Sequence, residues 1–491
     1  MTPINRSSAR LFGAALLLAL LGWTQPAAAD GAAADGAAAD GAAADSYATL
    51  TERFASQAPE RLAAYIRIDT TNPPGNESAG VAYLGAILDA AGIPYESAES
   101  APGRGNLWAR LPGSRPPDGG EPALVLLHHI DVVDADPRYW SVDPFGGEIR
   151  DGYVWGRGAL DMKGTAIAQL QAFLALHASG KRLNRDVLLV ATADEEAGGA
   201  LGAGWLIEHH PEIFAGAGFL LNEGGSGTVM GDDVVLSVEV TQKVPLWLRL
   251  TAHGQPGHGS APQPATAVTR LLRAGDRLAQ TSFAPRVVAP VRDLFEGIAP
   301  YQPEPLRERY ASIDSAVQDD AFMRYLQLTD PGAHALLRNT CSITRLEGSS
   351  KINVVPTEAA MELDCRLLPD QDPQAFIAEV ATIVNDPAIA IETLLSFTPA
   401  VSPTSSSLYR MIEATAADRM PAARVIPGVL TGFTDSHYFR DLGIASYGFN
   451  AFVIPREDRR GVHGNDERIG VDTLVEGTRF MIELVDRFTT Q

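Results

Sequence analysis

The segment Ala123-Leu-Val-Leu-Leu-His-His129-Ile-Asp131 decides the fold class, because a short apolar run ends directly at a histidine pair and an aspartate. Two similar apolar runs follow, Val187 to Ala191 and Gly218 to Leu221. Runs of this length are typical of parallel strands that are buried on both faces. Between the first two runs, Met162 to His177 carries apolar residues at helical spacing. The resulting β-α-β order predicts an α/β fold in which helices flank a mostly parallel sheet.

A different pattern begins near Lys243 and predicts a smaller α+β domain inserted into the larger one. At 491 residues the chain exceeds what one hydrophobic core usually fills. We therefore expect the larger domain to comprise residues 46–242 and 400–491, and the smaller one residues 243–399 with a mostly helical insertion at about 281–339. The elements predicted after Lys243 are strands over Val244 to Leu250, around Ile343 and Met361 and over Ile389 to Leu395, and helices over Ala265 to Leu278, Pro373 to Val384 and Val471 to Phe488.

The N-terminal segment is typical of a signal peptide. Arg6 and Arg10 precede an apolar run from Leu11 to Trp23, and Ala27-Ala28-Ala29 offers a small-residue cleavage site, so we expect residues 1–29 to be removed. About 13 apolar residues fall short of the roughly 20 that span a bilayer, which makes an uncleaved anchor the weaker alternative. Three Gly-Ala-Ala-Ala-Asp copies then predict a low-complexity spacer over residues 30–45. The sequence predicts a periplasmic or secreted protein without stable membrane insertion after cleavage.

The charge balance is strongly acidic. Thirty-nine basic residues face 60 acidic ones, for a net charge of −21. Such a chain repels phosphate backbones and anionic lipid surfaces, so nucleic acid is excluded as an expected partner.

The two cysteines, Cys341 and Cys365, are too few for a disulfide scaffold or a cysteine-based zinc site. They could lie on neighbouring strands and pair in an oxidising compartment. Sequence spacing does not fix the geometry that a bridge needs, so the bridged state is the less favoured alternative.

Acidic and histidine side chains follow each of the three predicted strands. Because ligands bind at the carboxyl ends of strands in an open α/β sheet, we expect these side chains to meet in one cleft. One acid after a strand is more often a helix cap, but this number in register favours a site. The side chains are His129 and Asp131 after the first strand, Asp194, Glu195 and Glu196 after the second, Glu223 after the third, Asp161 in the glycine-rich loop Trp155 to Gly164, and the late His463.

The chemistry of this set indicates a metal site. Carboxylates and imidazoles suit zinc, with cobalt or manganese possible. The sequence has no His-Glu-x-x-His, Gly-x-Ser-x-Gly, Walker or Gly-x-Gly-x-x-Gly motif. A two-metal site remains, in which ions about 3.5–4 Å apart share a bridging carboxylate.

With these residues in place, the chain resembles the co-catalytic zinc exopeptidases and deacylases, a family that includes aminoacylase, glutamate carboxypeptidase, acetylornithine deacetylase and succinyl-diaminopimelate desuccinylase. The resemblance runs from about Ser46 to the end of the chain. It rests on His129-Ile-Asp131, Gly158-Ala-Leu-Asp161-Met-Lys-Gly164, Asp194-Glu195-Glu196, Glu223-Gly-Gly, His258, Asn353-Val-Val-Pro356, Arg366 and His463. Thr434-Asp435-Ser436 and Gly448-Phe449-Asn450 resemble most the carboxypeptidase S and N-acyl amino acid hydrolase branch, from which Phe433 departs as a bulky ring beside the loop.

The resemblance implies a role for each metal ligand. Asp161 would bridge two divalent ions, with His129 and Glu223 on one ion and Glu196 and His463 on the other.

Two further acids would act beside the ions. Asp131 would orient His129 from behind. Glu195, which is left free because Glu196 binds metal, would take a proton from the metal-bridging water and deliver it to the leaving amine.

The resemblance also implies substrate contacts. His258 would stabilise the charge on the carbonyl oxygen, reaching the site of a neighbouring subunit in a homodimer whose smaller domain serves as lid and dimerisation domain. Arg366 and Asn353 would clamp the free carboxylate of the substrate. The expected enzyme is a carboxypeptidase, dipeptidase or N-acyl amino acid hydrolase that cuts the amide bond next to a free-carboxylate amino acid. The alternative is a catalytically silent extracytoplasmic protein that binds amino acids or metal.

Overall fold

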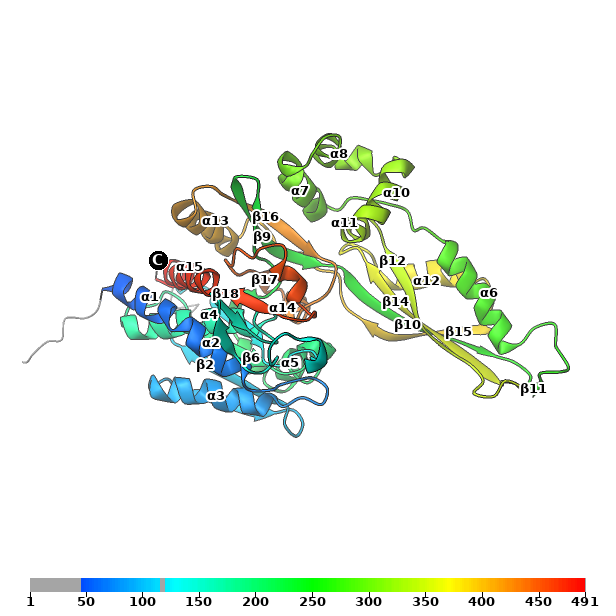
Figure 1. Cartoon of the computed structure of the whole chain (residues 1–491), viewed down its shortest axis with the longest axis horizontal. Helices are drawn as coiled ribbons and strands as arrows, with labels where there is room; N and C mark the ends of the chain where they lie inside the picture. Colours follow the sequence, from blue (N-terminus) through cyan, green and yellow to red (C-terminus); the bar gives the residue numbers. More distant parts are fainter. Residues whose placement is uncertain (1–45, 115–119, 491) are drawn as a thin grey trace, which may run out of the picture. The chain divides into compact units, whose positions relative to one another are not determined.

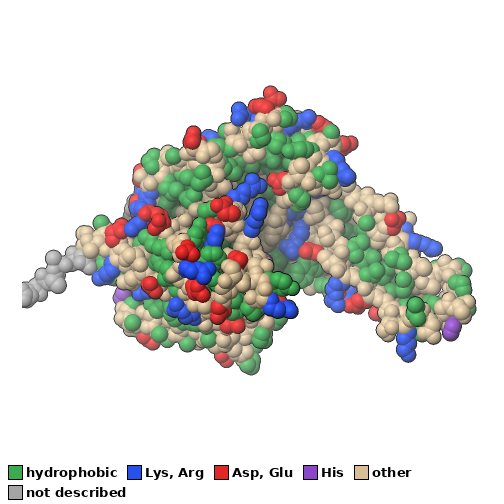
Figure 2. Space-filling model, in the orientation of Figure 1, with side chains coloured by type: hydrophobic (Ala, Val, Ile, Leu, Met, Phe, Trp, Pro, Cys, Tyr) green, Lys and Arg blue, Asp and Glu red, His purple; other side chains and the backbone are tan. Residues whose placement is uncertain are grey.

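The computed structural model describes residues 46–114 and 120–490, and the predicted signal peptide and spacer lie outside these residues. Among the described helices, none combines the length and the apolar character that crossing a bilayer requires. Figure 2 shows acidic and basic side chains interspersed over the face that it draws.

The larger sheet has nine strands and confirms the predicted α/β fold (Figure 1). Its centre is parallel, because β3 pairs in parallel with β6 and β7, and β7 with β17. The three predicted strands are β3, β6 and β7, each one or two residues longer than the apolar run that predicted it. The strand order is β1 (Tyr95–Glu99), β2 (Gly105–Leu111), β6 (Val187–Thr192), β3 (Ala123–His129), β7 (Ala217–Asn222), β17 (Ala445–Gly448), β9 (Asp233–Gln242) and β16 (Ala423–Leu430), with β8 (Gly227–Met230) paired to β9.

Helices cover both faces of this sheet. Helix α4 packs against β3 and is itself covered by α15, α1 and α2, which explains why it is buried almost all round. Gly180, at φ 61°, ends α4 in the left-handed conformation that glycine adopts without strain. The helices are α1 (Tyr47–Ser56), α2 (Ala58–Ile66), α3 (Glu77–Ala90), α4 (Lys163–Ser179), α5 (Ala203–His209), α13 (Ser407–Arg419), α14 (Ser436–Asp441) and α15 (Val471–Thr489), and a small antiparallel sheet contains β4 (Glu148–Arg150), β5 (Tyr153–Trp155) and β18 (Arg468–Gly470).

A second, antiparallel sheet is formed by residues between 244 and 396. The alternation in β10 buries one face of this sheet against α6 and α12. Much of β12 is exposed, as expected for the edge strand of a sheet covered on one face. The strand order is β12 (Thr340–Glu347), β14 (Glu358–Leu367), β10 (Val244–His253) and β15 (Ile389–Ser396), with helices α6 (Ala267–Gln280) and α12 (Pro373–Val384) and a separate two-stranded pair, β11 (Gly257–His258) and β13 (Val354–Val355).

The stretch predicted as a helical insertion contains five helices with a core of their own. Its last turn is held by buried Lys243, whose Nζ donates to the carbonyl oxygens of Ala335 (2.7 Å) and Arg338 (2.6 Å). An ammonium is favourable at carbonyls that lack helical partners. The helices are α7 (Ala289–Ile298), α8 (Leu306–Ala311), α9 (Ile313–Ala316), α10 (Asp320–Thr329) and α11 (Pro331–Leu336).

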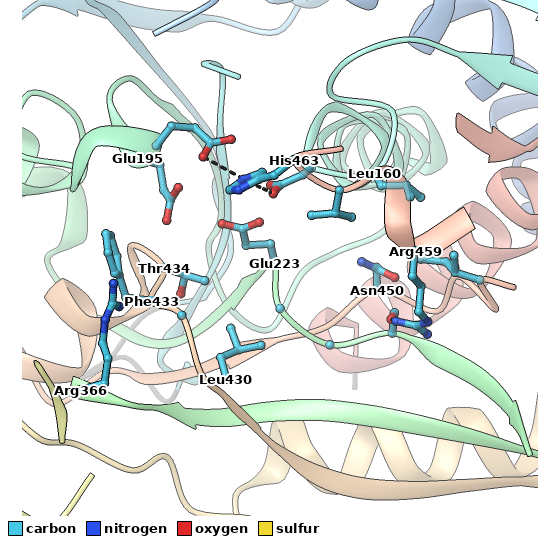
Figure 3. Close-up of a pocket in the computed structure, with 18 residues that line it drawn as sticks. Leu160, Glu195, Glu223, Arg366, Leu430, Phe433, Thr434, Asn450, Arg459 and His463 are labelled. Carbon is cyan, nitrogen blue, oxygen red and sulfur yellow. Dashed lines mark hydrogen bonds and ion pairs between the residues drawn. The ribbon is translucent and has the colours of Figure 1, made fainter. Parts of the chain in front are cut away.

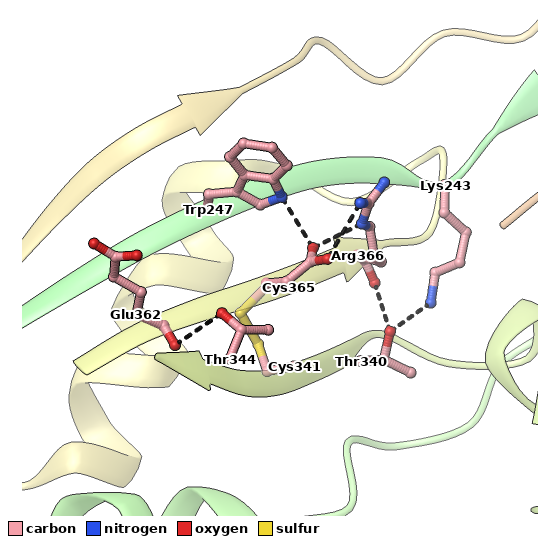
Figure 4. The surroundings of a disulfide bond; sticks show 9 residues. Lys243, Trp247, Thr340, Cys341, Thr344, Glu362, Cys365 and Arg366 are labelled. Carbon is pink, nitrogen blue, oxygen red and sulfur yellow. Dashed lines mark hydrogen bonds and ion pairs between the residues drawn. A yellow bond between two sulfur atoms is a disulfide. The ribbon is translucent and has the colours of Figure 1, made fainter. Parts of the chain in front are cut away.

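Cys341 and Cys365 form a disulfide, so the alternative that the sequence favoured less is the one in the structure (Figure 4). The antiparallel pairing of β12 with β14 places the two residues directly opposite each other. This register, which sequence spacing does not reveal, brings the sulfur atoms together. The bridge ties β12 to the part of β14 that carries Arg366.

Candidate active site

The predicted ligands come from the carboxyl ends of neighbouring parallel strands. His129 is the last residue of β3, and Glu223 follows β7 directly. Glu195 and Glu196 open a short 3-10 turn, η2 (Glu195–Ala197), just after β6. Asp161 precedes α4 and lines the same cavity as Glu195, Glu196 and Glu223.

Asp161 lies between two histidines. Its Oδ1 is 3.3 Å from His129 Nε2, and its Oδ2 is 3.1 Å from His463 Nε2. Glu223 Oε1 lies 3.5 Å from His129 Nε2, and Glu196 Oε2 lies 3.2 Å from His463 Nε2. Each half of the cluster therefore has one imidazole and one carboxylate, with Asp161 shared between them. Figure 3 shows Glu195, Glu223 and His463 of this group around the cavity. This arrangement is the one that a carboxylate bridging two ions requires.

The side chains suit divalent cations. Two groups, His129 with Glu195 and Glu223, and His129 with Asp161 and Glu196, bring their candidate ligand atoms within 4.8 Å of one another. Glu196 Oε1 is buried and accepts no hydrogen bond within the described part of the chain. A buried carboxylate oxygen in that condition is costly unless a cation contacts it. Oxygen and imidazole donors in this number fit zinc, cobalt or manganese.

The ionisation of the cluster shows how strongly its charges interact. Burial raises the pKa of Glu195 well above its usual range, and Glu223 raises it further. Burial, followed by Asp161, raises the pKa of Glu223 to about 8. Hydrogen bonds to Asp161 and Glu196 raise the pKa of His463 to about 10. Protons and histidinium charges thus stabilise the crowded carboxylates by themselves, and metal ions would compete with those protons.

Asp131 lies behind His129, on the side away from the cavity of the other carboxylates, which is the place that the prediction gave it. His129 Nδ1 lies 2.8 Å from the main-chain oxygen of Asp131 and 3.5 Å from its carboxylate. The carboxylate also accepts hydrogen bonds from Asn72 Nδ2 and from the backbone N–H groups of Glu195 and Glu196. Asp131 therefore fixes His129 through its backbone and the η2 turn through its side chain.

Two buried acids that the sequence left without a role also shape the site. Glu467 accepts hydrogen bonds from the backbone N–H groups of Leu160 (2.7 Å) and Asp161 (3.0 Å) and pairs with Arg157 at 2.7 Å. Asp194 pairs with Arg104 at 2.7 Å. Asp194 follows the second predicted strand together with Glu195, whereas no local pattern marks Glu467, which lies four residues beyond His463.

A cavity of about 550 Å³ opens over the cluster. Arg366 lines it, with Nε 2.7 Å from Asp364 Oδ1 and its guanidinium 5.4 Å from the centre of the Phe433 ring. Arg366 Nη1 is buried and donates to no acceptor among the residues described. Phe433, which the sequence marked as a departure, therefore forms a wall of the cavity and a face for the arginine.

His258 and Asn353 do not reach this cavity. His258 is exposed on β11, with its Nδ1 2.6 Å from Ser260 Oγ. Asn353 is exposed just before β13 and accepts a hydrogen bond from the backbone N–H of Gly259 (2.8 Å). The two predicted substrate contacts lie beside each other, but neither lines the cavity that holds Arg366. Within one chain, the structure does not assemble the predicted clamp of Arg366 and Asn353.

Comparisons with known proteins agree with this geometry. The family model for "Peptidase family M20/M25/M40" matches residues 125–487. N-fatty-acyl-amino acid synthase/hydrolase PM20D1 of Xenopus tropicalis is 34% identical over 374 residues, covering 74% of this chain and 72% of that protein. Aminoacylase-1B of Rattus norvegicus is 26% identical and covers 86% of this chain and 92% of its own length.

A solved structure shares the fold. The M20 family metallo-carboxypeptidase Sso-CP2 from Sulfolobus solfataricus superposes with a TM-score of 0.67 at 18% identity, covering 87% of this chain and 98% of that one. The family model covers well over half of the chain, and it spans each predicted metal ligand. The chain therefore belongs to the peptidase family M20/M25/M40 and is a metal-dependent amide-bond hydrolase of that family.

Proposed function

We propose that this chain hydrolyses N-acyl amino acids, releasing the free amino acid and the acyl carboxylate, with two zinc ions held by His129, Asp161, Glu196, Glu223 and His463. The proposal replaces the alternative of a silent binding protein, because Glu195 and four of the predicted ligands line one cavity and the fifth, His129, contacts two of those ligands. The relatives that are named for action on acylated amino acids support it.

The residues that line the cavity favour acylated amino acids over free dipeptides as substrates, because its acids are already engaged. Its acids are Asp161, Glu195, Glu196 and Glu223, and all four belong to the metal cluster or to the base. A free dipeptide brings an ammonium group on the acyl side of the bond, and among the described residues no further carboxylate lines the cavity to receive it. Apolar side chains also line the cavity, namely Leu160, Leu430, Ile454 and Val462. Such a wall favours an acyl group without a positive charge.

Glu195 is positioned to move the protons of the reaction. Its Oε2 lies 4.0 Å from His129 Nε2, farther than either oxygen that we assign to the metals on that side. When bound, the ions supply Lewis-acid activation of the water and the amide carbonyl. Glu195 takes the proton of the attacking water and gives it to the amine nitrogen as the carbon–nitrogen bond breaks. The buried Nη1 of Arg366 donates to the carboxylate of the amino acid.

A second copy of the chain would complete the site. His258 lies on β11 and Asn353 directly before β13, and both side chains are exposed. Neither residue lines the cavity of its own chain. A homodimer that brings this pair to a neighbouring cavity would add a donor for the developing oxyanion and a second contact for the substrate carboxylate.

The chain would act outside the cytoplasm, in the periplasm or after secretion. The N-terminal sequence supports export, and the Cys341–Cys365 disulfide suits an oxidising compartment. A fusion of residues 1–29 to a reporter that is active only after export would test this proposal directly.

The substrate is tested by incubating zinc-loaded full chain with a panel of N-acyl leucines and leucine-containing dipeptides and measuring free leucine by mass spectrometry. We expect release from the N-acyl leucines and much slower release from dipeptides with a free amino group. Faster cleavage of the dipeptides would contradict the proposed acyl substrate while leaving the family assignment intact.

A further inference from the structure

A second arginine lines the cavity on the side away from Arg366. Figure 3 shows Arg366 and Arg459 on opposite sides of Glu223 and His463, and both side chains border the same cavity. Arg459 belongs to the short 3-10 turn η5 (Asp458–Gly461), which leads into the His463 loop. If Arg366 receives the carboxylate of the amino acid, Arg459 lies toward the acyl part of the substrate.

The hydrogen-bond partners of Arg459 are all neutral. Nη1 donates to Ser226 Oγ (2.8 Å), and Nη2 donates to Gly227 O (2.5 Å) and Thr228 Oγ1 (2.6 Å). A guanidinium has five N–H donors, so these three bonds leave two. Nε is one of them, since it is buried and has no acceptor within the described ranges.

Three buried arginines of the same domain lie against carboxylates, whereas a fourth, Arg185, lies 3.9 Å from Glu121 and packs over the Phe488 ring. Arg104, Arg157 and Arg440 each lie within 2.7–2.8 Å of a carboxylate oxygen, from Glu77 and Asp194, Glu467 and Glu239 respectively. Burial lowers the pKa of Arg459, and no charged neighbour opposes this effect. A buried charge is normally paired, because removing it from water is costly. Arg459 is thus a partly buried cation on a cavity wall, and within residues 46–114 and 120–490 its hydrogen-bond partners include no carboxylate.

We propose that Arg459 binds a carboxylate at the far end of the acyl group, so that the enzyme prefers N-acyl amino acids whose acyl part is a dicarboxylic acid. This inference rests on the proposed function. The apolar residues of the same cavity, Leu160, Ile454 and Val462, would contact the methylene groups that separate the amide from the terminal carboxylate. Hydrolysis would then release a dicarboxylate and an amino acid. A plain alkyl chain would fill the same space but leave the guanidinium unpaired, which disfavours it.

The test compares acyl leucines of matched chain length on zinc-loaded full chain. The pairs are N-succinyl- and N-butanoyl-leucine, N-glutaryl- and N-pentanoyl-leucine, and N-adipoyl- and N-hexanoyl-leucine. We expect the wild type to have the higher kcat/KM for the dicarboxylic member of at least one pair. Arg459→Met should lower kcat/KM for that member roughly ten- to a hundredfold, mainly through KM, as expected for the loss of one charge-assisted hydrogen bond. The same variant should keep or raise kcat/KM for the alkyl partner, because the guanidinium that an alkyl chain leaves unpaired is gone.

The matched control is Arg460→Met, which removes the same charge from the adjacent, exposed position that does not line the cavity. It should leave kcat/KM for both members of each pair unchanged, and Arg459→Lys should retain part of the preference for the dicarboxylic member.

A wild type that prefers the alkyl member at every length would overturn the inference. So would an Arg459→Met variant that loses both members equally, because Arg459 would then serve only to hold its loop to Ser226 and Thr228. If no acyl leucine of either kind is cleaved while dipeptides are, the proposed function fails rather than this inference alone.

Discussion

The metal cluster and the β11–β13 pair differ in whether a single chain brings all the residues of a site together. Five metal ligands and Glu195 meet because they follow strands and loops that the larger sheet brings to one edge. His258 lies on β11 and Asn353 directly before β13, and both are exposed. The fold of one chain therefore accounts for the first group completely. The second group does not line the cavity of its own chain, and we propose that it contacts the cavity of a second copy.

Removing the proposed general base from the metal cluster should have the largest effect on activity. Glu195→Gln should lower kcat by roughly 10²–10⁴-fold, the usual share of general acid-base catalysis, because the amide cannot accept the proton of the attacking water. Zinc content should stay as in the wild type, since Glu195 is not among the assigned ligands. Glu208→Gln, on the exposed side of α5, is the matched control. Near-normal turnover of Glu195→Gln would assign the proton transfer to another group.

The exposed pair can be tested by complementation. His258→Ala should lower kcat by roughly 10²–10³-fold, as for the loss of an oxyanion donor. Co-expression of His258→Ala with Glu195→Gln should restore roughly a quarter of the wild-type activity, because half of random dimers are mixed and each has one intact site. Size-exclusion chromatography would confirm that mixed dimers form. Full activity of a monomeric enzyme would show that no second chain is needed.

Arg366 lines the cavity at the metal cluster, although it belongs to β14 of the second sheet. Arg366→Ala should raise KM for N-acyl amino acids roughly ten- to a hundredfold, because one charge-assisted contact to the carboxylate is lost. Substrates whose carboxylate is amidated should respond much less. Steady-state kinetics on matched acid and amide substrates give the answer, and equal losses on both would place the clamp elsewhere.

The folding stability of the chain should depend on pH through the buried histidine His437. His437 stacks on Phe397 with ring centres 3.5 Å apart, and burial, aided by Arg440, lowers its pKa to about 3. The unfolded state binds a proton near pH 6.5 while the folded state does not, so stability falls as the pH drops below 6.5. Between pH 7 and pH 5 the wild type should lose about 2 kcal/mol more than His437→Leu. Denaturant unfolding at the two pH values measures the difference, and parallel losses in both proteins would exclude His437 as the cause.

The sequence could predict what depends on local pattern. Apolar runs located β3, β6 and β7, and the strand-end rule located His129, Glu195, Glu196 and Glu223 at their ends. Resemblance to a family added the division of roles, which geometry alone leaves more open because Glu195 also lies within ligand distance of His129.

What the sequence could not predict depends on tertiary register. The disulfide forms because β12 and β14 place Cys341 opposite Cys365, a pairing that a sequence separation of 24 does not reveal. Glu467 and Arg459 gain their importance from loops that fold back onto Asp161 and Ser226. Each of these residues, considered alone in the sequence, is an ordinary charged side chain in a loop.

The central claim is that one chain holds two metal ions through Asp161 and its neighbours. The most direct measurement is elemental analysis of the purified full chain after zinc loading and removal of free metal. We predict two zinc ions per wild-type chain and fewer than one in Asp161→Ala, because the residue that both ions share is lost. Asp232→Ala, an exposed position outside the cavity, should keep both ions. A wild-type chain that retains no zinc, or an Asp161→Ala variant that retains two ions, would contradict the account.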